Sequence, residues 1–411
     1  MPGDNAGDYG EGTRAVHLPP PPALASEPLA PPVIRSSTFA FETAQEYADV
    51  LGGRRPGYSY TRIDNPTAAA FALAVAALEG FAIDEEITGE AFGSGMAAIT
   101  ATLLALTGAG SHVVAPAACY GGTFSLLRDV LGRFGVAVTF VRGTGPADFA
   151  AACRPETTLV WTETIANPTL AVSDLPALAA VARDNSAALV VDSTFASPAV
   201  CRPLEHGADL VVHAATKYLG GHSDATGGVV VGRTALMAGV RQIRMETGGI
   251  LAPDEAFLLR RGLATLPLRV ARHCATAREF AETVAKHPRV ERLRYPGLSE
   301  HPDHALATRL FDKGRYGACV TVTPQGGRAA GMAFCDKLRL ARVAPSLGGH
   351  HTIVSHAAST THRQLDDAAL TAADIDPAAV RISIGLEDAA DLIADAVQAL
   401  DALDSGPPRE G

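Results

Sequence analysis

The sequence predicts an α/β fold with a large, mostly parallel sheet and a smaller α+β region towards the C-terminus. Between about residues 65 and 232, apolar strands of five or six residues alternate with helical stretches, which is typical of a sheet covered on both faces. Beyond this region long helices dominate at 253–287. We therefore expect an N-terminal arm (1–64), a large α/β domain (65–262) and a C-terminal α+β domain (263–411).

The elements of the large domain follow from hydrophobic runs and turn signals. Helices are expected at 66–80, 94–106, 122–134 and 174–184, and strands at 112–116, 136–141, 158–163, 187–192, 208–213 and 227–232. Open α/β sheets bind ligands beyond the carboxyl ends of their strands. Glu163 ends one strand, Asp192 ends another and Lys217 follows a third, so we expect a site at this edge.

The C-terminal domain is expected to contain strands at 318–324 and 380–385 and a closing helix near 387–403. Residues 1–35 are rich in Pro, Gly and Ala and indicate an extended arm. The final residues, DSGPPREG, indicate a disordered tail.

Composition narrows the classes of partner. The net charge of -10 argues against a nucleic-acid or anionic-membrane surface. No apolar run is long enough to span a bilayer, and the first residues lack the features of a signal peptide, so we expect a cytoplasmic protein. The six cysteines are scattered without zinc-site spacing, so we expect reduced thiols and no metal.

Lysine is unusually scarce. The chain has 30 arginines and four lysines, and Lys217 is the only lysine in the first 285 residues. Arginine serves equally well for solubility and ion pairs, but its guanidinium cannot form an imine. Scarcity alone fits chance as well as function, so the sequence around Lys217 has to decide.

The segment HAATKYLGGHSDATGG (213–228) places Lys217 directly after an apolar strand and before glycines that let backbone approach a ligand. Desolvation there would give the neutral amine that an imine requires. This segment resembles the lysine segment of the Cys/Met-metabolism pyridoxal-5′-phosphate (PLP) enzymes, the family of cystathionine γ-synthase, cystathionine γ-lyase and methionine γ-lyase. The similarity runs in order from about residue 32 to 390.

The resemblance implies the PLP-dependent transferase fold of the aspartate aminotransferase type (fold type I), with PLP bound in the large domain. It implies that Lys217 holds the cofactor as a Schiff base and shuttles protons. Asp192, in VVDSTFASP, would keep the ring nitrogen protonated. Taken by itself, an Asp at a strand end more often caps a turn, and it is the spacing and order of the motifs that favour the cofactor role.

A phosphate site is expected at FGSGMAAI (92–99), where a glycine-rich turn opens a helix. The resemblance assigns the phosphate to the amides of Gly95 and Met96 and to the hydroxyl of Thr216; the alternative for Ser94 is a helix N-cap. The family usually has a serine where this chain has Ala214, so one phosphate contact is missing.

Two further residues of the resemblance lie in the arm. GYSYTRIDNPT (57–67) contains Tyr60 and Arg62, which in the family reach the phosphate of a neighbouring subunit. Arginine suits this role because its guanidinium can donate two parallel hydrogen bonds. The resemblance therefore implies a homodimer at least, and a tetramer of two such dimers; the alternative is a surface turn.

The remaining expected contacts surround the cofactor ring and the substrate. The resemblance implies that Tyr120 (CYGGT) stacks on the cofactor ring near the leaving group. It also implies that Asn167 (TETIANPT) hydrogen-bonds the ring hydroxyl. It assigns Arg381 (VRISIG) to the substrate α-carboxylate, with Ser346 alongside. An isolated arginine on a strand would otherwise indicate a surface ion pair.

The family's reactions share their early steps, so motifs do not separate elimination from replacement. Ser125 stands where cystathionine enzymes commonly carry arginine, and His351 stands where they tend to carry glutamate. These departures favour γ-elimination or γ-replacement of the methionine γ-lyase type, on a sulfur-containing or O-acyl-homoserine-type amino acid. Open alternatives are a cystathionine γ-lyase, γ-synthase or β-lyase, a biosynthetic γ-replacement enzyme using S-adenosylmethionine, and a catalytically silent scaffold homologue.

Overall fold

The computed structural model describes residues 26, 28–360, 363, 370 and 373–403. It divides into two units, residues 1–32 and 33–411, and everything that follows concerns the second. Most of the expected extended arm and the whole expected C-terminal tail lie outside the described residues.

The first sheet has seven strands in the order β1-β7-β6-β5-β4-β2-β3. Its neighbours are parallel from β3 to β6, whereas β7 runs antiparallel to both β6 and β1. The mostly parallel sheet is thus confirmed. The strand bounds are Ile87–Phe92, His112–Pro116, Ala137–Val141, Thr157–Glu163, Ala188–Asp192, Leu210–His213 and Gly228–Arg233, for β1 to β7.

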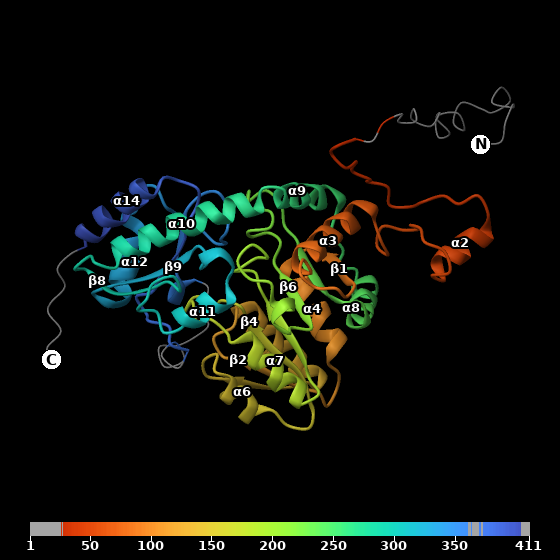
Figure 1. The fold of residues 1–411 in the computed structure, drawn as a ribbon, viewed down its shortest axis with the longest axis horizontal. Coiled ribbons are helices and arrows are strands. Elements are labelled where there is room, and N and C mark those ends of the chain that lie inside the picture. Colours follow the sequence, from red (N-terminus) through yellow and green to blue (C-terminus); the bar gives the residue numbers. More distant parts are fainter. Residues whose placement is uncertain (1–25, 27, 361–362, 364–369, 371–372, 404–411) are drawn as a thin grey trace. The chain divides into compact units, whose positions relative to one another are not determined.

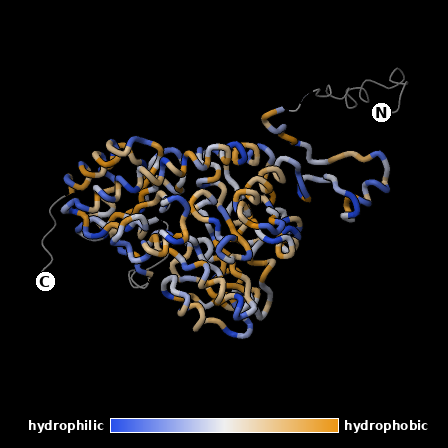
Figure 2. The backbone as a smooth tube through the Cα atoms, viewed as in Figure 1, coloured by the Kyte–Doolittle hydropathy of each residue, from blue (hydrophilic) through white to orange (hydrophobic). Residues whose placement is uncertain are grey.

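Both faces of this sheet are buried, which explains its continuous apolar strands (Figures 1 and 2). In β5, Leu189 and Val191 pack into one hydrophobic cluster and Val190 into the other. The first cluster also receives α3 (Pro66–Glu79) and α7 (Leu175–Asp184), and the second receives α4 (Gly95–Leu106) and α8 (Thr234–Thr247).

The prediction of one continuous α-helix at 122–134 was wrong. The segment predicted as a helix at 122–134 consists of α5 (Gly121–Ser125), a π-helical turn η1 (Leu126–Val130) and a 3₁₀ turn η2 (Leu131–Phe134). Gly121, Gly122 and Gly132 weaken the α-helix here. Leu126, Leu127 and Leu131 nevertheless remain buried, so the apolar pattern that prompted the prediction is satisfied by other turns.

The second sheet has five strands in the order β10-β11-β12-β9-β8 (Arg342–Val343, Ile353–His356, Val380–Ser383, Cys319–Pro324 and Val290–Arg294). All its pairs are antiparallel except β10–β11. Helices α9 (Pro253–Leu263) and α10 (Leu266–Val284) precede it. The described residues also form four further helices: α6 (Pro146–Ala152), α11 (His304–Leu310), α12 (Gly327–Lys337) and α14 (Ala389–Asp401).

The segment from Val33 to the start of α3 is tied to the rest of the chain near its two ends, by Arg35 to Asp254 at 2.6 Å and by Arg62 to the Met245 carbonyl at 2.8 Å, and it is largely exposed between them. Its helix α2 (Ala44–Leu51) has no buried residue, and Figure 1 shows it standing apart from the helices that cover the first sheet. A single bridge between Thr38 and Tyr60 pairs the two ends of this segment. Among the described residues, no helix has the length and apolar character needed to cross a membrane.

Candidate active site

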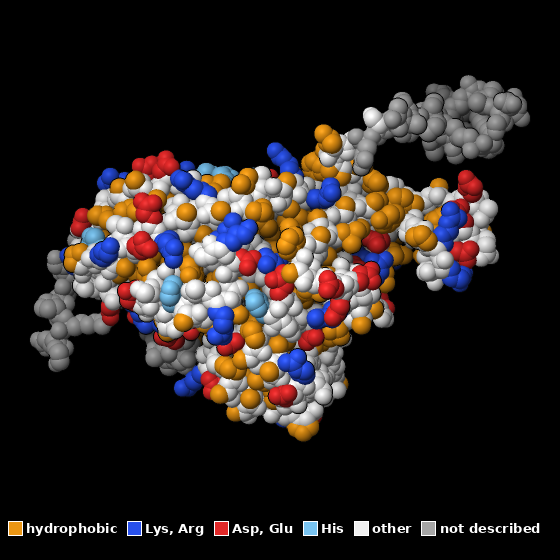
Figure 3. Space-filling model, viewed as in Figure 1, with side chains coloured by type: hydrophobic (Ala, Val, Ile, Leu, Met, Phe, Trp, Pro, Cys, Tyr) orange, Lys and Arg blue, Asp and Glu red, His pale blue; other side chains and the backbone are white. Residues whose placement is uncertain are grey.

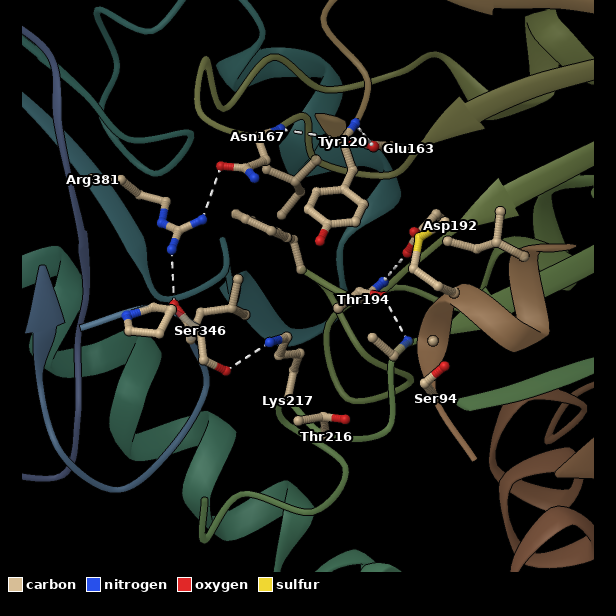
Figure 4. Close-up of a pocket in the computed structure, with 18 residues that line it drawn as sticks. Ser94, Tyr120, Glu163, Asn167, Asp192, Thr194, Thr216, Lys217, Ser346 and Arg381 are labelled. Carbon is tan, nitrogen blue, oxygen red and sulfur yellow. Dashed lines mark hydrogen bonds between the residues drawn. The ribbon is translucent and has the colours of Figure 1, made fainter. Parts of the chain in front are cut away.

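A cavity of ≈ 320 Å³ lies at the carboxyl edge of the first sheet and is closed by Arg381 on β12 and by the loop between β10 and β11 of the second sheet (Figure 4). Strand ends at β4 and β5 and the turn after β6 form one wall, as the ligand rule for open sheets predicts. The lining residues are Ser94, Gly95, Met96, Ile99, Tyr120, Glu163, Ile165, Asn167, Asp192, Thr194, Phe195, Ala214, Thr216, Lys217, Pro345, Ser346, Leu347 and Arg381.

Lys217 projects into this cavity with its amine within hydrogen-bond reach of a hydroxyl. Its Nζ donates to the Oγ of Ser346 at 2.6 Å. Burial first, and the charge of Arg381 second, lower the pKa of Lys217 to about 8. Near neutral pH, a far larger share of this amine is therefore neutral than of a solvated lysine, and the neutral amine is the form able to act as a nucleophile or base.

Asp192 and Glu163 are paired residues on the neighbouring parallel strands β5 and β4. Both side chains are at most 9% exposed and both line the cavity. Burial raises the pKa of Asp192, and the Thr194 side chain and backbone oppose the shift. The Thr194 amide donates to its Oδ1 at 2.9 Å. Asp192 thus presents a fixed, buried carboxyl that a cationic partner would stabilise.

The N-terminus of α4 opens onto the same cavity. Ser94 is indeed its N-cap and accepts a hydrogen bond from the Ala97 amide at 3.1 Å, while the preceding amides of Gly95 and Met96 lack partners inside the helix. A Cβ on Gly95 would come within 2.7 Å of the Ala214 Cβ, so only glycine allows this close approach. Thr216 bonds the Gly227 main chain in the adjoining turn.

Arg381, on β12, forms the opposite wall. Its Nη1 donates to Asn167 Oδ1 at 3.0 Å and its Nη2 to the Ser346 carbonyl at 2.8 Å, while its buried Nε has no partner among the described residues. Burial lowers the pKa of this guanidinium. A buried cation that contacts only neutral acceptors and keeps an unused donor is suited to an anionic ligand.

Tyr120 lies at the mouth of the cavity with its side chain 41% exposed. Beyond it a groove of ≈ 700 Å³ continues, shares Tyr120 and Pro345 with the cavity, and includes Ser125. His351 lines neither space and is exposed. Ser125 therefore faces the groove into which the cavity opens, whereas His351 does not.

Tyr60 and Arg62 are not brought to the cavity of their own chain. Both are exposed, and Arg62 donates from Nη1 to the Met245 carbonyl at 2.8 Å. The sequence-predicted cofactor contacts therefore separate into a group that converges within one chain and a pair that does not.

Two residues with polar side chains in the cavity, Glu163 and Thr194, were given no role from the sequence. Glu163 was noted only as a strand end, although a carboxyl beside the expected Asp192 was a usable signal. Thr194 was missed, and its hydroxyl accepts the Ala214 amide at 2.8 Å, which ties the Asp192 turn to the lysine turn.

The size of the cavity and the chemistry of its lining residues fit PLP. The cavity size lies in the range of about 300–1,000 Å³ for small-molecule sites. It offers a partly neutral amine, a buried carboxyl for a protonated ring nitrogen, and a helix N-terminus for a phosphate. Fold and site together define a fold type I, PLP-dependent enzyme.

Comparison with known proteins identifies the family. A family model described as "Cys/Met metabolism PLP-dependent enzyme" matches residues 12–401, and the chain belongs to that family. The chain is 41% identical over 403 residues to the L-methionine gamma-lyase of Pseudomonas deceptionensis, covering 97% of this chain and 99% of the relative. It is also 41% identical over 395 residues to the cystathionine gamma-synthase of Mycobacterium bovis, covering 96% and 97%.

A solved structure supports the same assignment. A structure described as an O-acetylhomoserine (thiol)-lyase of Campylobacter jejuni matches this chain with a TM-score of 0.86 and 28% identity, over 91% of this chain and 95% of that one. That structure carries a pyridoxyl-lysine phosphate. PLP is thus the cofactor of this family, and the protein is a PLP-dependent lyase or transferase, as the sequence predicted.

Proposed function

We propose that this protein catalyses γ-elimination or γ-replacement on an amino acid with a sulfur or acyl-oxygen substituent at Cγ, in the manner of a methionine γ-lyase. One observation carries the proposal: Lys217 and Arg381 both contact Ser346, through its hydroxyl and its carbonyl respectively. The group that removes the Cα proton and the group that binds the α-carboxylate therefore adjoin each other.

Lys217 would hold PLP through its amine, Asp192 would face the ring nitrogen, and the amides of Gly95 and Met96 would receive the phosphate with the Thr216 hydroxyl. Asn167 would face the ring hydroxyl. When bound, PLP supplies an electron sink for carbanions formed at Cα and Cβ of the substrate.

The side chains then divide the remaining work. Arg381 orients the substrate by its α-carboxylate, which fixes the Cα–H bond relative to Lys217. Lys217 Nζ, in its neutral form, takes the proton from Cα and can return it elsewhere on the same face. The Tyr120 hydroxyl, at the mouth of the cavity, lies where a departing sulfur or oxygen would need a proton.

Substrate preference is proposed from the groove beyond Tyr120. Ser125 lines it with a neutral hydroxyl, where an arginine would attract a distal carboxylate. A substrate without a charged distal group, such as methionine, homocysteine or an O-acyl homoserine, therefore fits better than cystathionine.

We also propose a homodimeric active unit, assembled further into a tetramer. Tyr60 and Arg62 lie outside their own cavity, and the segment carrying them exposes Tyr47 and Leu51 as well. Figure 3 shows apolar side chains exposed over α3 and over the segment that leads to α2, as expected for a surface that packs against a second copy. The second copy would complete the phosphate site in place of the contact missing at Ala214.

The test is product analysis with a panel of methionine, homocysteine, cystathionine, O-acetylhomoserine and S-adenosylmethionine, with and without an added thiol. Methionine or the O-acyl substrate should give 2-oxobutyrate, or the thiol adduct, faster than cystathionine does. Pyruvate as the main product would establish β-cleavage and overturn the proposal. A protein that binds no PLP and releases no product would overturn it as well.

A further inference from the structure

Glu163 is a buried carboxyl that the mechanism above does not use. It is 5% exposed, ends β4 and lines the cavity beside Asp192. Two neighbouring buried carboxyls disfavour each other's ionisation, so a second one is retained only where other interactions compensate.

The compensating interactions are two main-chain amides on separate loops. Glu163 Oε1 accepts the Tyr120 N–H at 2.6 Å, and Oε2 accepts the Asn167 N–H at 3.3 Å (Figure 4). Tyr120 follows β2, and Asn167 follows β4. These are the two residues whose side chains the family resemblance places against the cofactor ring.

We infer that Glu163 is a positioning residue, whose single carboxylate ties the Tyr120 loop to the Asn167 loop and so fixes both side chains at the cofactor ring. The inference rests on the proposed function only for what those side chains touch. Tyr120 needs such a tether because α5 begins there without a side-chain cap, and its phenol is 41% exposed.

The chemistry of the group supports this role. A carboxyl group keeps acceptor capacity on its oxygens whether it is ionised or neutral, whereas the amide nitrogen of a glutamine only donates, so one loop amide must lose its partner in Glu163→Gln. Burial first, and Asp192 second, raise the pKa of Glu163 to about 8, and the two amides lower it in return. Losing either amide would therefore favour the neutral acid.

The first test uses hydrogen exchange in the cofactor-free protein. Glu163→Gln should speed amide exchange at Tyr120 or Asn167 by about 5–10-fold, the expected cost of one net hydrogen bond. Strand β5 should be unchanged. The matched control is Glu79→Gln, a fully buried glutamate that bonds His213 at 2.7 Å rather than a main-chain amide, and that should leave exchange at both positions as it was. Unchanged exchange in Glu163→Gln would overturn the inference.

The second test is a double-mutant cycle on the holoenzyme. Glu163→Gln should lower kcat by about 10-fold or more with little change in KM, and should weaken the visible circular dichroism of bound PLP. In a Tyr120→Phe background the same change should cost clearly less, because its effect passes through Tyr120. Additive losses would contradict positioning. If the wild-type protein had no lyase or transferase activity, the proposed function would be wrong. The hydrogen-exchange result would still show whether Glu163 holds the Tyr120 and Asn167 loops together.

Discussion

The cavity wall and the arm segment 33–64 both supply residues that the family resemblance assigns to one cofactor, yet they differ in burial. Lys217 and Asp192 stand at the ends of buried strands and have partners within the chain. Tyr60 and Arg62 are exposed, and helix α2 of the same segment has no buried residue.

This contrast separates two ways of building a site. Strand ends are positioned by the sheet, so each chain can form that half of the site alone. An exposed arm is positioned only by what it packs against, which under the proposed function is a second copy. Substitutions in each half test this division, beginning with the half that one chain carries alone.

Replacing Lys217 should have the largest effect. Lys217→Ala removes both the attachment point of PLP and the base at Cα, so activity should fall by at least about 10²–10⁴-fold, the range for a positioned acid–base group. Steady-state product formation and the visible absorbance of the purified protein measure the two losses.

Lys286→Ala is the matched control, because Lys286 is an exposed lysine outside the cavity. It should retain wild-type activity and colour. Wild-type turnover in Lys217→Ala would place the catalytic amine elsewhere. The strand ends of one chain would then not carry the catalytic half of the site.

The same contrast explains what the sequence could predict. Lys217, Asp192 and Asn167 converge because apolar strands fix where their ends meet, and a local pattern reports such strands. The irregular turns at 121–134 and strand β1 were not predicted. The first segment is rich in glycine and the second mixes polar and apolar residues, so tertiary packing decides their secondary structure more than local sequence does. The tether from Glu163 to Tyr120 spans 43 residues through main-chain amides, and side-chain patterns do not report main-chain contacts.

The arm half of the comparison is tested by Arg62→Ala. Loss of a charge-assisted phosphate contact, worth about 1.5–3 kcal/mol, should weaken PLP affinity by about 10–150-fold. Titration of cofactor-free protein by fluorescence measures this change. Arg55→Ala removes an arginine of the same segment that pairs with Glu46 at 2.9 Å, and should leave PLP affinity unchanged.

Mixed oligomers locate the contact. Arg62→Ala and Lys217→Ala chains, refolded together, should regain activity in hybrid dimers, because one of the two shared sites then has both intact residues. If mixing restores nothing above the parent variants, Arg62 does not act across an interface.

A smaller effect is expected at the mouth of the cavity. Ser125→Arg should raise kcat/KM for cystathionine relative to methionine by about 10-fold, equivalent to about 1.4 kcal/mol, because the guanidinium offers a partner to a distal carboxylate. Ser125→Met has similar length without the charge and serves as the control. An equal change for both substrates in Ser125→Arg would show that the groove does not receive the distal group.

The smallest effect concerns the pH dependence of cofactor uptake. The Lys217 amine reacts with an aldehyde only when neutral, and its pKa is lowered to about 8 from the usual 10.5, first by burial and second by Arg381. Uptake of PLP by cofactor-free protein, followed by stopped-flow absorbance, should therefore accelerate as pH rises through about 8 and level off above it. Arg381→Gln removes the charge but keeps the burial, so the midpoint should move upward by less than about one unit. Arg272→Gln, an exposed residue paired with Asp388, should not move it. A wild-type midpoint near 10.5 would mean that Lys217 is solvated, and that the cavity wall is no more sheltered than the arm.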